Sequence, residues 1–215
     1  MVRIWMVVLL GLGALWPQSL SAQSPDEANG PVRVGDRWTY ETKDELTGEP
    51  KGTYVVVVTE MSDKEIVNTV SFRGKNGSQL VVLDHDLNRL DDSIWKYKPN
   101  DAQGVRLPLT VGKTWRFQYD ARNMQNGAVL QTTGVAKVVA KETVTTPAGT
   151  FETFKIERHV RQHNTSDQTK NSESDVVTWY APEINRWVRR TFVTRIEKRV
   201  RSSGSEELAD FSRKM

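Results

Sequence analysis

The segment PVRVGDRWTY at residues 31–40 returns in altered form as PLTVGKTWRF at residues 108–117. Each copy runs from a proline through a Val-Gly turn to a tryptophan. Each is followed by a β-branched run, GTYVVVVTE at residues 52–60 and GVAKVVAKE at residues 134–142. Two copies are too few for a solenoid or a propeller, so the repeat predicts two related β modules.

Apolar and polar residues alternate along most of the chain, most clearly at residues 37–42, 114–119 and 154–160. A period of two is typical of half-buried strands, and Gly, Pro and Asn turns separate the runs. We therefore predict an all-β fold, an antiparallel sheet of about ten strands that forms an open barrel or a sandwich. Its two related halves are residues 31–98 and 108–212. They are expected to pack as one domain, with one shared core or two.

Two tryptophans, Trp38 and Trp115, occupy equivalent places in the two copies of the repeat. Matching positions in two modules favour a shared structural role over a ligand cleft. Since each indole can bury about 150–250 Å² of surface, we expect both to anchor the core.

The first 22 residues are predicted to be a secretory signal peptide. Arg3 is their only charged residue, and an apolar stretch at residues 4–15 precedes the small residues Ser21 and Ala22. A helix of that stretch would be about 18 Å long, against a bilayer core of about 30 Å. We expect cleavage, no retained transmembrane anchor, and a flexible leader at residues 23–30.

The composition excludes several classes of function. The chain has no cysteine, which rules out disulfides, thiol catalysis and an acylated cysteine. A secreted chain without disulfides fits a periplasmic or other bacterial envelope location. Thirty Lys and Arg against 27 Asp and Glu give a formal net charge of +3, which offers no argument for nucleic acid.

No catalytic or metal-binding motif is evident in the chain. There are three histidines and no Gly-x-Ser-x-Gly elbow. His159 and His163 are four residues apart, and on a strand that spacing spans about 13 Å, too far for one metal ion. We expect no enzyme activity, no cofactor and no metal.

The strongest local charge pattern is the Arg-rich segment at residues 186–201, with seven Lys or Arg and a single Glu. Aromatic residues interleaved with arginines can bind anionic groups. Alternatively, the segment is a solvated strand neutralised by acids at residues 206–210. For the C-terminus we predict, in preference to a capped helix turn at residues 206–211, a final strand that turns at residues 202–205 and pairs with residues 191–201. This hairpin would set those acids near Arg195, Lys198, Arg199 and Arg201.

Five residues are candidates for ligand binding. Trp179, Tyr180 and Trp187 flank the less symmetric turn of the second module and offer aromatic surface. Arg189 and Arg195 belong to the Arg-rich segment and offer positive charge.

Three motifs of the second module carry a resemblance to a known group. They are PAGTF at residues 147–151, WYAP at residues 179–182 and ELADF at residues 207–211. Over about residues 105–212 the chain resembles bacterial secreted β-proteins classed as domains of unknown function. Some of these are similar to the incomplete barrels of periplasmic lipoprotein carriers, which implies an apolar cavity. The resemblance supplies no catalytic residue to carry over to this chain.

The expected function is non-catalytic binding of an apolar or amphipathic envelope ligand by a secreted or periplasmic protein. The alternative is a structural or protein-interaction module that docks an envelope protein through the Arg-rich segment. An apolar cavity would favour the ligand carrier, and a filled core would favour the interaction module.

Overall fold

The computed structural model describes residues 32–99 and 104–213. The predicted signal peptide (1–22) and leader (23–30) lie outside these residues. The described part contains twelve strands and two short 3₁₀ turns. The strands are β1 (Arg37–Asp44), β2 (Pro50–Met61), β3 (Ile66–Phe72), β4 (Ser78–Leu83), β5 (Arg89–Asp91), β6 (Trp95–Lys98), β7 (Thr114–Asn123), β8 (Val129–Thr146), β9 (Gly149–Asn164), β10 (Ser172–Ala181), β11 (Arg186–Ile196) and β12 (Arg199–Ser212). The 3₁₀ turns are η1 (Gln168–Lys170) and η2 (Pro182–Ile184).

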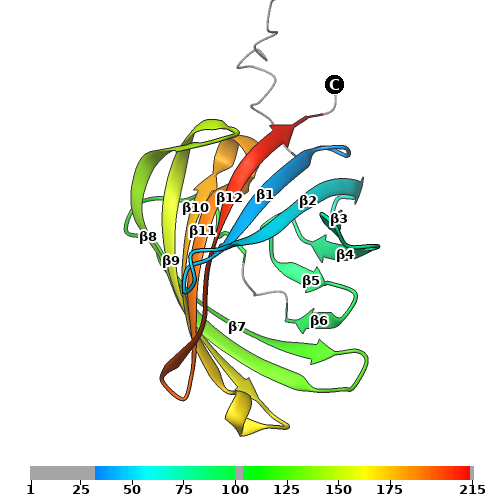
Figure 1. Ribbon diagram of the computed structural model, residues 1–215, viewed down its shortest axis with the longest axis vertical. Helices are drawn as coiled ribbons and strands as arrows, with labels where there is room; N and C mark the ends of the chain where they lie inside the picture. Colours follow the sequence, from blue (N-terminus) through cyan, green and yellow to red (C-terminus); the bar gives the residue numbers. More distant parts are fainter. Residues whose placement is uncertain (1–31, 100–103, 214–215) are drawn as a thin grey trace, which may run out of the picture.

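The twelve strands form one closed antiparallel barrel (Figure 1). Each strand pairs with the next along the chain, and β12 closes the ring by pairing with β1. The all-β antiparallel prediction is confirmed. The strand number is twelve rather than about ten because the region before the second module contains two short strands, β5 and β6. The sheet has no open edge among the described strands.

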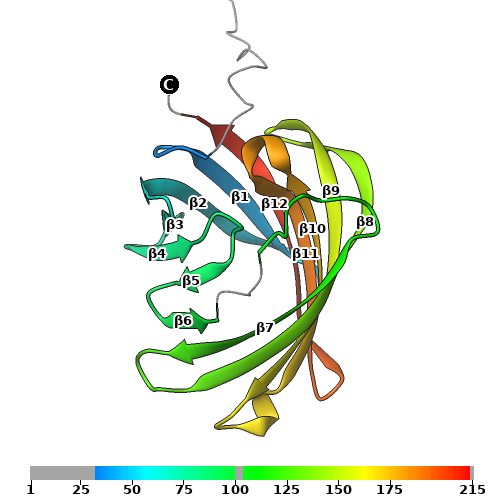
Figure 2. The same cartoon turned by 180° about the vertical axis from the view of Figure 1, so that it is seen from behind.

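The barrel wall is tall on one side and low on the other. Strands β8 and β9 have 18 and 16 residues, whereas β5 and β6 have only three and four. Figure 2 shows the long strands on one side and the short β4–β6 meander on the other. A single residue pair, Asp91 with Lys96, joins β5 to β6, so this side of the wall is thinly hydrogen-bonded.

The repeat has a common backbone geometry. In the first copy the Gly35 N–H donates to the Val58 carbonyl at 2.8 Å, and in the second the Gly112 N–H donates to the Val138 carbonyl at 2.8 Å. Both glycines have φ near +90°, a conformation that side chains disfavour. The same turn therefore starts β1 and β7 and aligns each with the strand that follows it.

The core consists of two apolar clusters, one around each repeated tryptophan. Trp38 is fully buried and packs with residues of β1, β2, β11 and β12. Trp115 is 6% exposed and packs mainly with residues of β7–β10. The prediction that both tryptophans are core anchors is confirmed. The division into modules at residues 31–98 and 108–212 stays a prediction.

Three residues that precede β7, Gly104, Val105 and Leu109, are buried. The Gly104 N–H donates to Asn88 Oδ1 at 3.0 Å, and the Val105 N–H donates to the Asp86 carbonyl. Val105 and Leu109 are buried against the cluster around Trp115. Val105 and Leu109 therefore attach this part of the chain to the core, while residues 106–108 between them are exposed.

The Arg-rich segment at residues 186–201 is not one strand. β11 ends at Ile196, a turn follows at Glu197 and Lys198, both with positive φ, and β12 begins at Arg199. The prediction that this hairpin turns at residues 202–205 is wrong, because those residues lie within β12. The final element is nevertheless a strand, as predicted. The earlier turn shifts the register, so that the acids of β12 face Arg189 and Arg190.

Candidate functional site

The barrel encloses a cavity of about 470 Å³. This volume is within the range of about 300–1,000 Å³ that is typical of small-molecule sites. Apolar side chains from strands around the barrel line much of it, among them Val56, Val70, Phe117, Val176 and Phe192. They face inward because strand side chains alternate between the two faces of a sheet. We call this space the barrel cavity.

Charged groups also line the barrel cavity: Arg89, Arg158, Arg186, Arg190 and Glu206. Positive groups outnumber negative ones four to one in this lining. Buried charges normally have a partner of opposite sign. The partners of each arginine therefore decide what the cavity can hold.

Two of the arginines have carboxylate partners. Arg190 lies 2.7 Å from Glu206 Oε2, which also accepts a hydrogen bond of 2.9 Å from the Tyr54 hydroxyl. Burial is the main cause that raises the pKa of Tyr54, and the Glu206 charge adds to it. Arg89 lies 3.3 Å from Asp92. These two cations are compensated inside the protein.

Arg158 has neutral partners. On β9 it donates to the Thr178 hydroxyl at 3.0 Å and to the Gly104 carbonyl at 3.3 Å. Burial, with a smaller contribution from the Arg190 charge, lowers its pKa to about 10. A lowered pKa for a guanidinium indicates an environment that disfavours the charged form.

Arg186 is held between aromatic rings. Its guanidinium carbon lies 5.0 Å from the Trp38 ring centroid and 4.6 Å from that of Trp187. The residue is 5% exposed, and its Nε has no hydrogen-bond partner among the described residues. Cation–π contacts orient this guanidinium but supply no negative charge.

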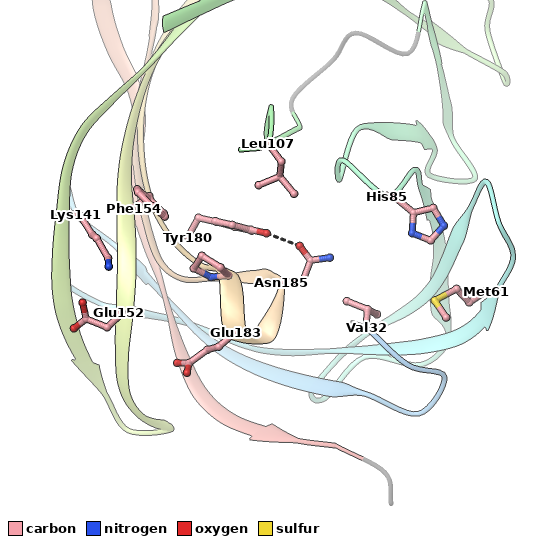
Figure 3. A pocket seen from close by; sticks show the side chains of 11 residues that line it. Val32, Met61, His85, Leu107, Lys141, Glu152, Phe154, Tyr180, Glu183 and Asn185 are labelled. Atoms are coloured by element: carbon pink, nitrogen blue, oxygen red, sulfur yellow. Dashed lines mark hydrogen bonds between the residues drawn. The ribbon is translucent and has the colours of Figure 1, made fainter. Parts of the chain in front are cut away.

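A second pocket, of about 700 Å³, adjoins the barrel cavity at one end of the barrel (Figure 3). Tyr180 lines both spaces, and its hydroxyl donates to Asn185 Oδ1 at 2.5 Å. Burial raises the pKa of Tyr180 to about 12, so the phenol is neutral at physiological pH. Glu152 and Glu183 also line this end pocket. Burial and the charge of Glu152 raise the pKa of Glu183.

Two of the five predicted ligand residues, Tyr180 and Trp187, line the barrel cavity. The Trp187 ring stacks on Tyr40 at 5.7 Å, and its carbonyl accepts a 2.7 Å hydrogen bond from the Tyr40 hydroxyl. Their role in binding stays a prediction.

The other three predicted residues do not line the barrel cavity, and Trp179 is partly buried against the cluster around Trp38. Trp179 neighbours the inward-facing Tyr180 and contacts Lys155 and Arg189, with its ring 5.3 and 5.9 Å from their charged groups. Arg189 pairs with Glu207, and Arg195 pairs with Asp175. The structure therefore does not gather the five residues into one site.

Sequence reasoning missed the inward-facing arginines. The sequence does contain a signal for them. Arg158 is two residues from both Ile156 and Val160 and therefore shares the apolar face of its strand with them. Arg190 likewise shares a face with Phe192. An arginine at an apolar position of an alternating strand is the feature that could have identified them.

Within residues 32–99 and 104–213, no cluster of three or more His, Asp or Glu side chains could hold a metal ion. His159 lies 2.8 Å from Asp175 on the outer face. None of the helical segments in this part of the chain is long and apolar enough to span a membrane.

Comparison with known proteins supports the predicted resemblance. Residues 113–190 match the DUF3108-like family, so the chain resembles bacterial β-proteins of unknown function. A comparison with curated proteins finds no match.

Two solved structures share the fold. One is a protein of Parabacteroides distasonis classed provisionally as a lipoprotein, with 13% identity, a TM-score of 0.55 and coverage of 85% of this chain and 97% of that one. The other is a protein of Bacteroides fragilis with a YmcC-like fold, classed provisionally as exported. It has 18% identity, a TM-score of 0.53 and coverage of 85% and 98%. At these identities the likeness concerns the fold alone.

Proposed function

We propose that this chain is a non-catalytic binding protein of the bacterial envelope that holds an apolar or amphipathic small molecule in the barrel cavity. The observation that carries the proposal is the cavity itself. A barrel that served only as a scaffold could fill its interior with side chains, as small barrels do. Here twelve strands leave about 470 Å³ open, between apolar residues and a few polar groups.

An envelope location agrees with the predicted signal peptide and with the absence of cysteine. The two solved structures with the same fold are classed provisionally as a lipoprotein and as an exported protein. We therefore place the site of action outside the cytoplasm.

The alternative, docking of a protein through the Arg-rich segment, has less support. Two arginines of this segment, Arg189 and Arg195, are already paired with Glu207 and Asp175. A surface whose charges are internally matched has less to offer an acidic partner.

Native mass spectrometry tests the proposed function directly. The full chain is exported to the periplasm of a bacterial host, purified without detergent, and measured before and after denaturation. A bound mass that is released on unfolding is the expected result. Protein that carries no ligand and takes up no fluorescent fatty acid would contradict the proposal.

Two substitutions on β10 provide a matched pair for this experiment. Val176→Phe adds volume to the cavity lining, whereas Val177→Phe adds the same volume at the neighbouring position, which faces away from the cavity. We expect Val176→Phe to lower ligand occupancy and Val177→Phe to leave it unchanged. Equal occupancy in both would show that the ligand lies elsewhere.

A further inference from the structure

Two of the four arginines that line the barrel cavity have no negative partner. Arg89 and Arg190 are paired with Asp92 and Glu206. Among the described residues, Arg158 and Arg186 make no ion pair. Their contacts are a hydroxyl, a carbonyl and aromatic rings.

Keeping two uncompensated guanidinium groups in a protein interior is costly. Neutral hydrogen-bond acceptors and aromatic faces replace only part of the hydration that a cation loses on burial. The lowered pKa of Arg158 is one expression of this cost. A bound anion would remove it, because each guanidinium could then make charge-assisted hydrogen bonds.

Three of the four arginines lie on one wall of the barrel, and the fourth, Arg89, is on β5. Arg158 is on β9, Arg190 is on β11, and Thr178 lies between them on β10, paired in register with Arg190. Arg186 is at the start of β11. Thr178 accepts the hydrogen bond from Arg158, so the hydroxyl group connects the two charged positions.

The opposite wall is largely apolar. β3 and β4 face β9–β11 across the ring (Figure 1). They present Val70, Phe72, Val81 and Leu83 to the same cavity, with Gln79 as the polar exception. The cavity therefore has a positively charged side and an apolar side.

We propose that the barrel cavity selects an anionic amphiphile, whose carboxylate or phosphate head group is bound by Arg158 and Arg186 and whose alkyl chain lies against β3 and β4. This inference rests on the proposed function and specifies its ligand class. Arg190 stays paired with Glu206 and adds positive potential beside the head group.

Calorimetric titration of the delipidated full chain tests the inference with four probes. Dodecanoate, dodecyl phosphate and dodecanol share one alkyl chain and differ in the head group, and inorganic phosphate has no chain. We expect at least one of the two anionic amphiphiles to bind about tenfold or more tightly than dodecanol, since hydrogen bonds to charged groups contribute strongly. The tighter of the two identifies the head group as carboxylate or phosphate.

Variants separate a ligand contact from a structural role. Arg158→Met should lower affinity for the preferred anion about tenfold or more while leaving dodecanol binding unchanged. Arg186→Lys keeps the positive charge but loses the planar guanidinium, which can donate two parallel hydrogen bonds. It should lower affinity for the preferred anion by a smaller factor. Arg161→Met is the matched control on β9, because Arg161 pairs with Glu173 on the exposed face. It should bind all probes as the wild type does.

Thermal unfolding of the ligand-free variants completes the test. Since Arg158 has no counter-ion, we expect Arg158→Met to unfold at the same temperature as the wild type or higher. A variant that loses stability and dodecanol binding together would assign Arg158 a structural role and overturn the inference.

Three other results of the titration would lead to different conclusions. Equal binding of dodecanol and both anions would overturn the anionic head group but leave the proposed function intact. Inorganic phosphate bound as tightly as dodecyl phosphate would overturn the amphiphile and indicate a simple anion site. Binding of none of the probes would overturn the inference and, if native mass spectrometry also finds no ligand, the proposed function.

Discussion

At the scale of single residues, the two copies of the repeat carry opposite charges at one position of the turn. Asp36 in the first copy corresponds to Lys113 in the second. Asp36 is fully buried and lies 3.1 Å from Arg213, near the end of the described chain. The Lys113 ammonium donates instead to the carbonyls of Arg106 and Pro108. The same place in the turn therefore anchors the C-terminal segment in one copy and the preceding linker in the other.

Removal of the cation from the Asp36–Arg213 pair should destabilise the folded protein. Arg213→Ala leaves the carboxylate of Asp36 buried without this partner, and such a change lowers the free energy of unfolding by about 3–5 kcal/mol. Urea denaturation measures the loss. Arg161→Ala, which breaks the exposed pair with Glu173, should cost less than about 1 kcal/mol. Equal losses of unfolding free energy in the two variants would contradict a larger contribution from the buried ion pair.

The raised pKa of Glu183 makes stability depend on pH. The folded chain binds this proton more tightly than the unfolded chain does, so stability falls as the pH rises from the ordinary glutamate pKa through the raised one. Glu183→Gln removes that dependence. We expect the variant to gain in unfolding temperature over the wild type at neutral pH and to match it in acid. A difference in unfolding temperature between variant and wild type that stays constant with pH would show that Glu183 does not cause the pH dependence.

At the scale of elements, two hairpins contain a phenylalanine directly opposite a glycine. Phe117 on β7 pairs with Gly134 on β8, and Phe192 on β11 pairs with Gly204 on β12. A Cβ atom at Gly134 would lie 2.2 Å from the Phe117 ring, so the ring occupies the space that a side chain would need. Both phenylalanines line the barrel cavity, and the two glycines let their rings pack over the neighbouring strand.

The Phe117–Gly134 contact can be tested by overpacking. Gly134→Ala should lower the free energy of unfolding by about 1–3 kcal/mol, because the Phe117 ring must move into the cavity. Adding Phe117→Leu to the same chain frees space and should recover part of the loss. A double-mutant cycle in urea measures this coupling. Strictly additive effects would show that the ring does not constrain the glycine.

At the scale of the whole molecule, the pairing of β1 with β12 closes the barrel. The pairs run from Arg37 opposite Ser212 to Asp44 opposite Gly204. Leu208 of β12 is fully buried in the cluster around Trp38. Closure satisfies two strand edges that would otherwise be exposed to other chains.

Removal of β12 should therefore prevent folding to a monomer. A chain that stops after Lys198 exposes the edges of β1 and β11, and we expect aggregation and loss of cooperative unfolding, measured by size-exclusion chromatography and thermal melts. The control is a circular permutant with joined termini and new ends between Glu197 and Lys198, which keeps all twelve strands. A stable monomeric truncation would contradict the role of closure.

The alternating pattern and the repeat were sufficient to predict the antiparallel all-β fold and the two buried tryptophans. Both depend on local chemistry, because a period of two places every second side chain on one face. The same pattern contains Arg158 on the apolar face of its strand, but the sequence did not identify it as a residue that lines a cavity.

Ring closure, the register of the last hairpin and the open volume inside the barrel were decided only by the tertiary structure. Closure depends on a pairing between residues about 170 positions apart. A register shift at Trp179 and Tyr180, opposite Trp187 and Arg189, determines which arginines of β11 face inward. The volume of the cavity depends on the radius of the barrel and on the total volume of the side chains that point inward. No single stretch of sequence determines that volume.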